Sequence, residues 1–221
     1  PAAPGRRSAS APRRSSRAGW ATRPGSPPGA RSANRRIERA GAAGLAYALV
    51  IRPWQLRRGA TDAEVGRSLP GDDLVPDPKC GYTQAITIKA SKSELWPWLV
   101  QIGYKRAGWY SHDWLHRLMG IAGSVDDKHR SAKRIIPELQ DLQVGDVVEI
   151  APEMGYVVVG IEPEQALILQ SRVDTGKWES LSSGDPLPAK YLCSSWVWYL
   201  EEIDEKTTRL IVRVRSDTNP G

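Results

Sequence analysis

Phenylalanine is absent from this chain of 221 residues, which also has only two cysteines and three histidines. Two cysteines are too few for a disulfide framework. Neither Cys80 nor Cys193 has a second Cys or a His at the spacing of a structural zinc site. The sequence also has neither the GxGxxG nor the GxxxxGK[ST] pattern that cradles phosphates, and no serine-nucleophile elbow. We therefore expect no metal and no cofactor.

Acidic residues are missing from the start of the chain. Residues 1–36 contain nine Arg and no acid, whereas the remaining 185 residues hold 22 bases and 25 acids, a net charge of −3. The overall charge of +6 thus belongs to the tail, and we expect no nucleic-acid binding by the folded part. Because the tail is nearly all Arg, Ser, Ala, Pro and Gly, we expect it to be disordered. A basic arm for nucleic acid or anionic lipid and a targeting peptide are the alternatives.

Long hydrophobic runs are also missing. The apolar stretch 40–51 has twelve residues, whereas a membrane-spanning helix needs about 20. Residues 37–51 therefore stay open to several interpretations: a shortened membrane anchor, an interfacial helix, a signal-peptide core or a helix packed on the domain. The expected location is the cytoplasm or a membrane surface. Since the chain begins with Pro1 rather than Met, either it is a fragment or the tail is foreign to the natural protein.

Local signals for secondary structure are plentiful after residue 51. Residues 52–81 are rich in Pro and Gly, so we expect an extended connection with one short helix at 61–68, capped by Thr61 and Glu64. The compact domain is expected from residue 82 onward. Strands are predicted at 84–89, 147–150, 156–161, 166–170, 194–200 and 208–215, and helices at 92–102, 114–119 and 135–142.

The order of these elements indicates an α+β fold. One strand comes first, then short helices, then several strands with short connections, which is typical of an antiparallel meander rather than of alternating βαβ units. We expect the strands at 194–200 and 208–215 to pair as a hairpin across the turn at 204–207.

Several segments resemble, in order, a bacterial group of the SRPBCC superfamily. They are the runs Leu95-Trp-Pro-Trp-Leu-Val-Gln-Ile-Gly103 and Gly108-Trp-Tyr-Ser-His-Asp113, together with residues 52–54, 59–64, 69–76, 136–140, 144–146 and 208–213. The resemblance implies a helix-grip fold, in which a curved antiparallel sheet grips a long C-terminal helix around an apolar cavity. START lipid-transfer domains and polyketide cyclases or dehydrases are relatives, but no agreed catalytic residues carry over. The family pattern continues beyond residue 221, so we expect residues 82–221 to form a helix-grip domain that lacks its C-terminal helix.

Aromatic side chains are the leading candidates for a binding site. The chain has nine Trp and seven Tyr, which offer large apolar area with a polar edge and suit a cavity for a mostly apolar ligand. The alternative is a core that uses Trp in place of Phe. The candidate ligand-binding residues are Trp98, Trp109, Tyr110, Trp196, Trp198, Tyr199 and Arg213.

Arg213 is the charged member of this set. It alternates with Val212 and Val214 along its strand, so these valines face one side of the sheet and Arg213 the other. If its side is the inner one, Arg213 could bind a ligand carboxylate or phosphate; otherwise it lies on a solvated outer face.

Acid–base candidates occur in one segment, residues 108–113, which we expect to be a loop at the cavity mouth. They are Tyr110, His112 and Asp113; His112 has a pKa suited to a general base, and Asp113 alternatively caps the helix that follows.

Three functions follow from these observations. The first is binding of an apolar or lipid-like small molecule in the cavity. The second is a cyclase, dehydratase or hydrolase reaction there, and the third is membrane-tethered interaction through residues 37–51.

Overall fold

The structure is a computed structural model, and it describes residues 52–110, 124–126 and 130–221. Several expectations fall outside the described residues: those for 1–36, 37–51 and 114–119, and those for His112 and Asp113. In the part of the chain that is described, no helix is long and apolar enough to cross a membrane.

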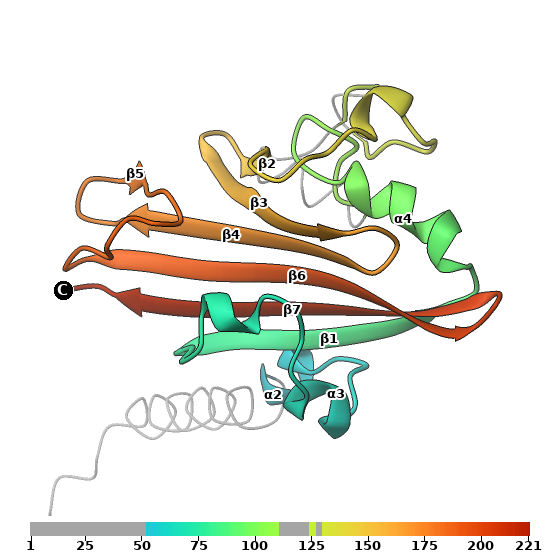
Figure 1. The fold of residues 1–221 in the computed structure, drawn as a ribbon, viewed down its shortest axis with the longest axis horizontal. Helices are drawn as coiled ribbons and strands as arrows, with labels where there is room; N and C mark the ends of the chain where they lie inside the picture. Colours follow the sequence, from blue (N-terminus) through green and yellow to red (C-terminus); the bar gives the residue numbers. More distant parts are fainter. Residues whose placement is uncertain (1–51, 111–123, 127–129) are drawn as a thin grey trace, which may run out of the picture. The chain divides into compact units, whose positions relative to one another are not determined.

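The described chain forms one antiparallel sheet with short helices (Figure 1). The strands are β1 (Cys80–Ile88), β2 (Val147–Ala151), β3 (Met154–Glu162), β4 (Ala166–Asp174), β5 (Glu179–Ser180), β6 (Tyr191–Asp204) and β7 (Thr207–Asn219). The helices are α2 (Arg52–Leu56), α3 (Asp62–Gly66) and α4 (Lys92–Val100), with 3-10 turns η2 (Asp72–Leu74) and η3 (Pro137–Leu139). The α+β prediction is therefore confirmed at this level.

The sheet order is β1-β7-β6-β4-β3-β2, with the two-residue β5 paired to β4. From β2 to β7 the path follows the chain, as the predicted meander requires, and β1 closes the other edge beside β7. The predicted hairpin of β6 and β7 is confirmed, with Asp204 opposite Thr207 at its turn. β5 was not expected, because its two residues carry no local strand signal of their own.

The two faces of the sheet are covered by different segments. Side chains alternate along each strand, so Trp196, Trp198 and Leu200 share one face, which we call the helix face because α4 packs there. The buried residues of this core are Val100, Leu142, Val148, Val158, Leu167 and Leu169.

Residues 59–76, which we call the strap, cover part of the opposite face, the strap face. Leu74 of the strap packs against Ile168 and Val197 of the sheet, and Leu69 and Val75 are also buried. The expectation of an extended connection at 52–81 was too simple, since the structure has α2, α3 and η2 there. The predicted cap of α3 is confirmed: Thr61 Oγ1 accepts from Glu64 N at 3.2 Å, and the Glu64 carboxylate accepts from Thr61 N at 2.7 Å.

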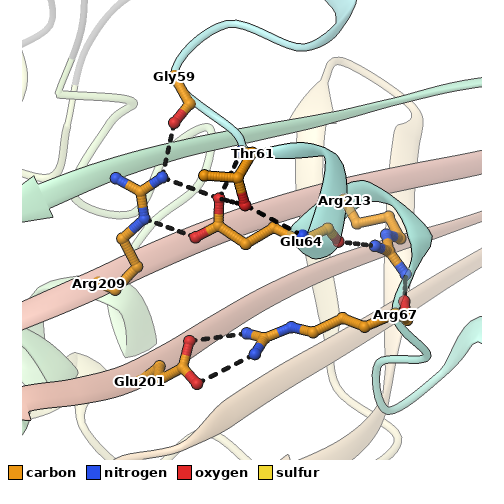
Figure 2. A network of polar contacts seen from close by, with 7 residues as sticks. All are labelled: Gly59, Thr61, Glu64, Arg67, Glu201, Arg209 and Arg213. Carbon is orange, nitrogen blue, oxygen red and sulfur yellow. Dashed lines mark hydrogen bonds and ion pairs between the residues drawn. The ribbon is translucent and has the colours of Figure 1, made fainter.

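Hydrogen bonds of three arginines hold the strap on the sheet (Figure 2). Arg209 of β7 donates to both Glu64 carboxylate oxygens, at 2.7 and 2.9 Å, and Arg67 of the strap donates to both Glu201 carboxylate oxygens, at 3.0 and 2.8 Å. Arg213 donates to the strap carbonyls of Glu64 at 2.6 Å and Arg67 at 2.9 Å. Each guanidinium group offers several N–H donors in one plane. These donors bind the strap, whose backbone does not pair with a strand of the sheet.

Candidate functional site

Helix α4 supplies one wall of a cavity on the helix face. Its start is fixed by a second capping box, in which Ser91 Oγ accepts from Glu94 N at 3.3 Å and the Glu94 carboxylate accepts from Ser91 N at 2.8 Å. Leu95, Trp98 and Leu99 follow the helical spacing i, i+3 and i+4, which places them on one side of α4, and Ile102 comes just after the end of the helix. All four residues line the cavity.

The sheet supplies the facing wall. Trp198 and Leu200 of β6 lie beside Leu210 of β7, and Leu200 and Leu210 are directly opposite each other in the register. Ile88 at the end of β1 completes this wall. The cavity has a volume of about 520 Å³, within the range of small-molecule sites.

The turn after α4 brings two further aromatic residues to the cavity, Trp109 and Tyr110. Their backbone N–H groups both donate to Ser131 Oγ, at 3.2 and 3.0 Å. The chain reaches Ser131 through Gly108, whose φ of +83° favours glycine and where an added Cβ would lie 2.7 Å from Ser131 Oγ. Tyr110 itself has φ +51°, an uncommon conformation for a residue with a side chain.

Trp196 lies at the centre of an aromatic cluster behind this turn. Its ring stacks on Trp109, with centroids 5.6 Å apart, and contacts Trp198 at 5.1 Å and Tyr156 edge-on at 5.6 Å. Such pairs add about 0.5–1.5 kcal/mol each beyond their buried area. The cluster therefore fixes the orientation of Trp109 and Trp198 in the cavity wall.

Gln101 is a fully buried polar residue beside the cavity. Its Oε1 accepts from Ile136 N at 2.9 Å and from Gln140 Nε2 at 3.1 Å. Its Nε2 donates to the Arg134 carbonyl at 3.1 Å and to the Tyr110 hydroxyl. Gln101 thereby ties the turn that carries Tyr110 to the segment at 134–140.

The described residues of the cavity wall carry few polar groups. The indole Nε1 atoms of Trp109, Trp196 and Trp198 are buried, and none has a hydrogen-bond partner within the described residues. Trp109 and Trp198 line the cavity directly. Burial raises the pKa of Tyr110, which is the single titratable side chain among the ten described lining residues.

The structure divides the predicted ligand-binding residues into three groups. Trp98, Trp109, Tyr110 and Trp198 line the cavity, and Trp196 stacks against Trp109 behind the wall. Tyr199 and Arg213 lie on the strap face instead, because they alternate with Trp198 and Val212 along their strands.

Arg213 is neither a cavity residue on the helix face nor solvated, so both alternatives drawn from the sequence need correction. Its side chain is 4% exposed and forms an ion pair with Asp72, with 2.6 Å between Nη1 and Oδ2. It also donates to Thr83 Oγ1 at 3.1 Å, besides the strap carbonyls. Alternation along the sequence correctly placed Arg213 on the face opposite Val212 and Val214. It could not reveal that the strap covers the face on which Arg213 lies.

Several lining residues were missed by the sequence analysis. Leu95, Leu99 and Ile102 follow the helical spacing of Trp98, and that spacing could have identified them. Leu200 and Leu210 share the face of Trp198, but only the hairpin register shows that they are neighbours. Gln101 stands out as the polar residue in an apolar run, which was a usable signal.

Comparisons with known proteins add little to this picture. No family model and no curated protein matches the chain. Among solved structures, the chain is similar to a conserved protein from Geobacillus kaustophilus at 13% sequence identity, over 63% of this chain and 74% of that one, with a TM-score of 0.27. A likeness at that level carries no argument about fold or function.

Proposed function

We propose that the cavity between α4 and the sheet binds an apolar small molecule of lipid-like or polycyclic type. The observation that carries the proposal is a cavity of about 520 Å³ whose ten described lining residues are all aliphatic or aromatic. Placing an apolar molecule there removes apolar surface from water, which contributes about 25 cal/mol per Å².

The resemblance to the SRPBCC superfamily supports the same proposal, which extends to a helix-grip fold. That fold pairs an antiparallel sheet with an apolar cavity on one face, and the helix face of this sheet carries such a cavity. We favour binding over catalysis because Tyr110 is the one titratable group among the described lining residues. The other acid–base candidates, His112 and Asp113, lie outside the described residues.

Nile red, a neutral polycyclic dye, provides a direct test. We expect saturable binding of one dye per chain with a blue-shifted emission. Leu210→Trp places a bulky ring in the cavity, so it should weaken dye binding at least about tenfold, equivalent to about 1.4 kcal/mol. Ile203→Trp is the matched control, because Ile203 belongs to the same hairpin but is 55% exposed.

The proposal is contradicted if dye binding is absent. It is also contradicted if Leu210→Trp and Ile203→Trp bind the dye equally well, since the dye would then sit elsewhere. Circular dichroism of both variants would establish that the fold is retained.

A further inference from the structure

The strap face carries a second cavity, with a volume of about 540 Å³. It lies where the strap, the chain just before β2 and the connection after β5 meet strands β3, β4 and β6. Gln170 and Arg172 of β4 line it, and they alternate with Leu169, which packs in the core of the helix face. None of its described lining residues lines the cavity beside α4, so the two cavities are separate.

Most of the wall of this second cavity is aliphatic. Val157 lies directly opposite Gln170 in the sheet register, so both side chains point to the strap face. Val144 and Leu187 are 63% and 41% exposed and form an accessible rim. An alkyl chain laid against this wall would be removed from water. The aliphatic lining residues of the strap face are Leu74, Val144, Val157, Val159 and Leu187.

Gln170 adds an amide to the wall. The residue is 7% exposed, and its Oε1 accepts from Ser183 Oγ at 3.3 Å. The other end of the amide, Nε2, has no hydrogen-bond partner within the described residues. Unlike the indole nitrogens of Trp109 and Trp198, Nε2 is not fully buried. The small exposed part of Gln170 therefore includes a hydrogen-bonding group that is available to a ligand.

Arg172 brings a positive charge to the same wall. Its two Nη atoms donate to the backbone carbonyls of Ser182 and, at 2.5 Å, of Asp185. The guanidinium group therefore lies beside Ser183, which lines the cavity. Its charge also acts on a second lining residue, because burial raises the pKa of the Cys193 thiol and Arg172 opposes that rise. A guanidinium group has five N–H donors, so donors remain for a ligand.

No acidic side chain balances this charge in the described wall of the cavity. The described lining residues include no Asp or Glu, and Arg172 bonds to carbonyls instead. The carboxylate of nearby Asp185 accepts from Ser182 N at 2.8 Å. A ligand carboxylate would match the planar donors of Arg172, whereas a ligand cation would be repelled.

We propose that the strap-face cavity binds a small monocarboxylate with an aliphatic body. The carboxylate binds Arg172 and the Gln170 amide, and the aliphatic body packs against Val157 and Leu187. This site is distinct from the one proposed on the helix face, so either proposal can fail without the other.

Three eight-carbon probes that differ in their head group test the selection: octanoate, 1-octanol and octylammonium. Each is titrated calorimetrically at pH 7.5 into Leu210→Trp, whose helix-face cavity is blocked. Octanoate should bind at least about tenfold more tightly than 1-octanol, and octylammonium should bind most weakly. Adding Arg172→Gln should remove most of this preference and leave 1-octanol binding unchanged, which also shows that the fold is retained. Arg57→Gln is the control of equal charge change, because Arg57 does not line this cavity.

A second pair of variants tests the location. Leu187→Trp fills the rim of the strap-face cavity and should weaken octanoate at least about tenfold, whereas Ile203→Trp should not. Octanoate should bind the wild type and Leu210→Trp equally. The proposal is overturned if octanoate binds no more tightly than 1-octanol, if Arg172→Gln weakens both equally, or if Leu187→Trp leaves octanoate binding unchanged. Loss of Nile red binding alone would contradict the proposed function and leave this proposal standing.

Discussion

Arg213 and Asp72 form an almost buried ion pair that joins the strap to β7 of the sheet. The Nη1 and Oδ2 atoms are 2.6 Å apart, and the two side chains are 4% and 13% exposed. Asp72 also accepts from the backbone N–H of Leu69 at 2.9 Å, so one carboxylate fixes both the arginine and the turn before η2.

The first prediction concerns this pair. Arg213→Met should destabilise the fold by about 3–5 kcal/mol, because it removes the closer of the two arginines beside the Asp72 carboxylate and leaves it only Arg215, whose Nη1 is 3.9 Å from Oδ1. Arg57→Met is the control: the Arg57–Asp62 pair is exposed, and such a pair contributes about 0–1 kcal/mol. Urea unfolding of both variants measures the difference. The double variant Arg213→Met, Asp72→Leu should recover part of the loss, and a double variant as unstable as Arg213→Met would count against this account.

The second prediction concerns acid stability. Hydrogen bonds from Arg209 hold the pKa of Glu64 at about 2, below its ordinary value of 4.5. A lowered folded-state pKa contributes stability above the unfolded pKa, and this contribution is lost as the pH falls through the folded pKa. Because solvent screens this pair, the contribution to stability is smaller than the full shift implies, about 1–2 kcal/mol.

The unfolding free energy of the wild type should therefore exceed that of Glu64→Gln at pH 6, and the gap should shrink between about pH 4.5 and pH 2. Chemical unfolding at several pH values measures it. A gap that stays constant over this range would show that the carboxylate charge is not responsible.

The third prediction tests the turn that carries Trp109 and Tyr110. Gly108→Ala should cost about 1–3 kcal/mol, because its φ is +83° and the new Cβ would meet Ser131 Oγ at 2.7 Å and Ser131 Cα at 2.9 Å. Gly184→Ala is the matched control, since no heavy atom lies within 4 Å of its Cβ position. Thermal unfolding should separate the two variants, and equal melting temperatures would contradict the prediction.

The fourth prediction concerns Gln101. Gln101→Leu should destabilise the protein by about 2–4 kcal/mol, because the backbone N–H of Ile136 and the carbonyl of Arg134 would lose their partner. Gln143→Leu removes an exposed amide of the same type and should change stability by less than about 0.5 kcal/mol. Denaturant midpoints compare the two. Near-equal midpoints would mean that water replaces the Gln101 bonds.

Local patterns in the sequence determined most of the secondary structure. The Thr61–Glu64 and Ser91–Glu94 capping boxes lie within one helical turn, so they were recognisable from residue spacing alone, and both are formed. The hairpin of β6 and β7 was equally predictable, since its strands are long and its turn is short. Alternation along one strand also placed Arg213 on the face opposite Val212 and Val214, as in the structure, but only the register of β6 and β7 put Trp198 on the face of these valines.

Only the tertiary structure decided what covers each face of the sheet. Arg213 and Glu64 are 149 residues apart, and no spacing rule links them, yet their contact turns the strap face into a buried interface. The same holds for Gln101 and Ile136, 35 residues apart, whose hydrogen bond ties the end of α4 to the segment before η3. Short-range capping and alternation are encoded in neighbouring residues, whereas contacts between distant segments form only when chain packing brings them together.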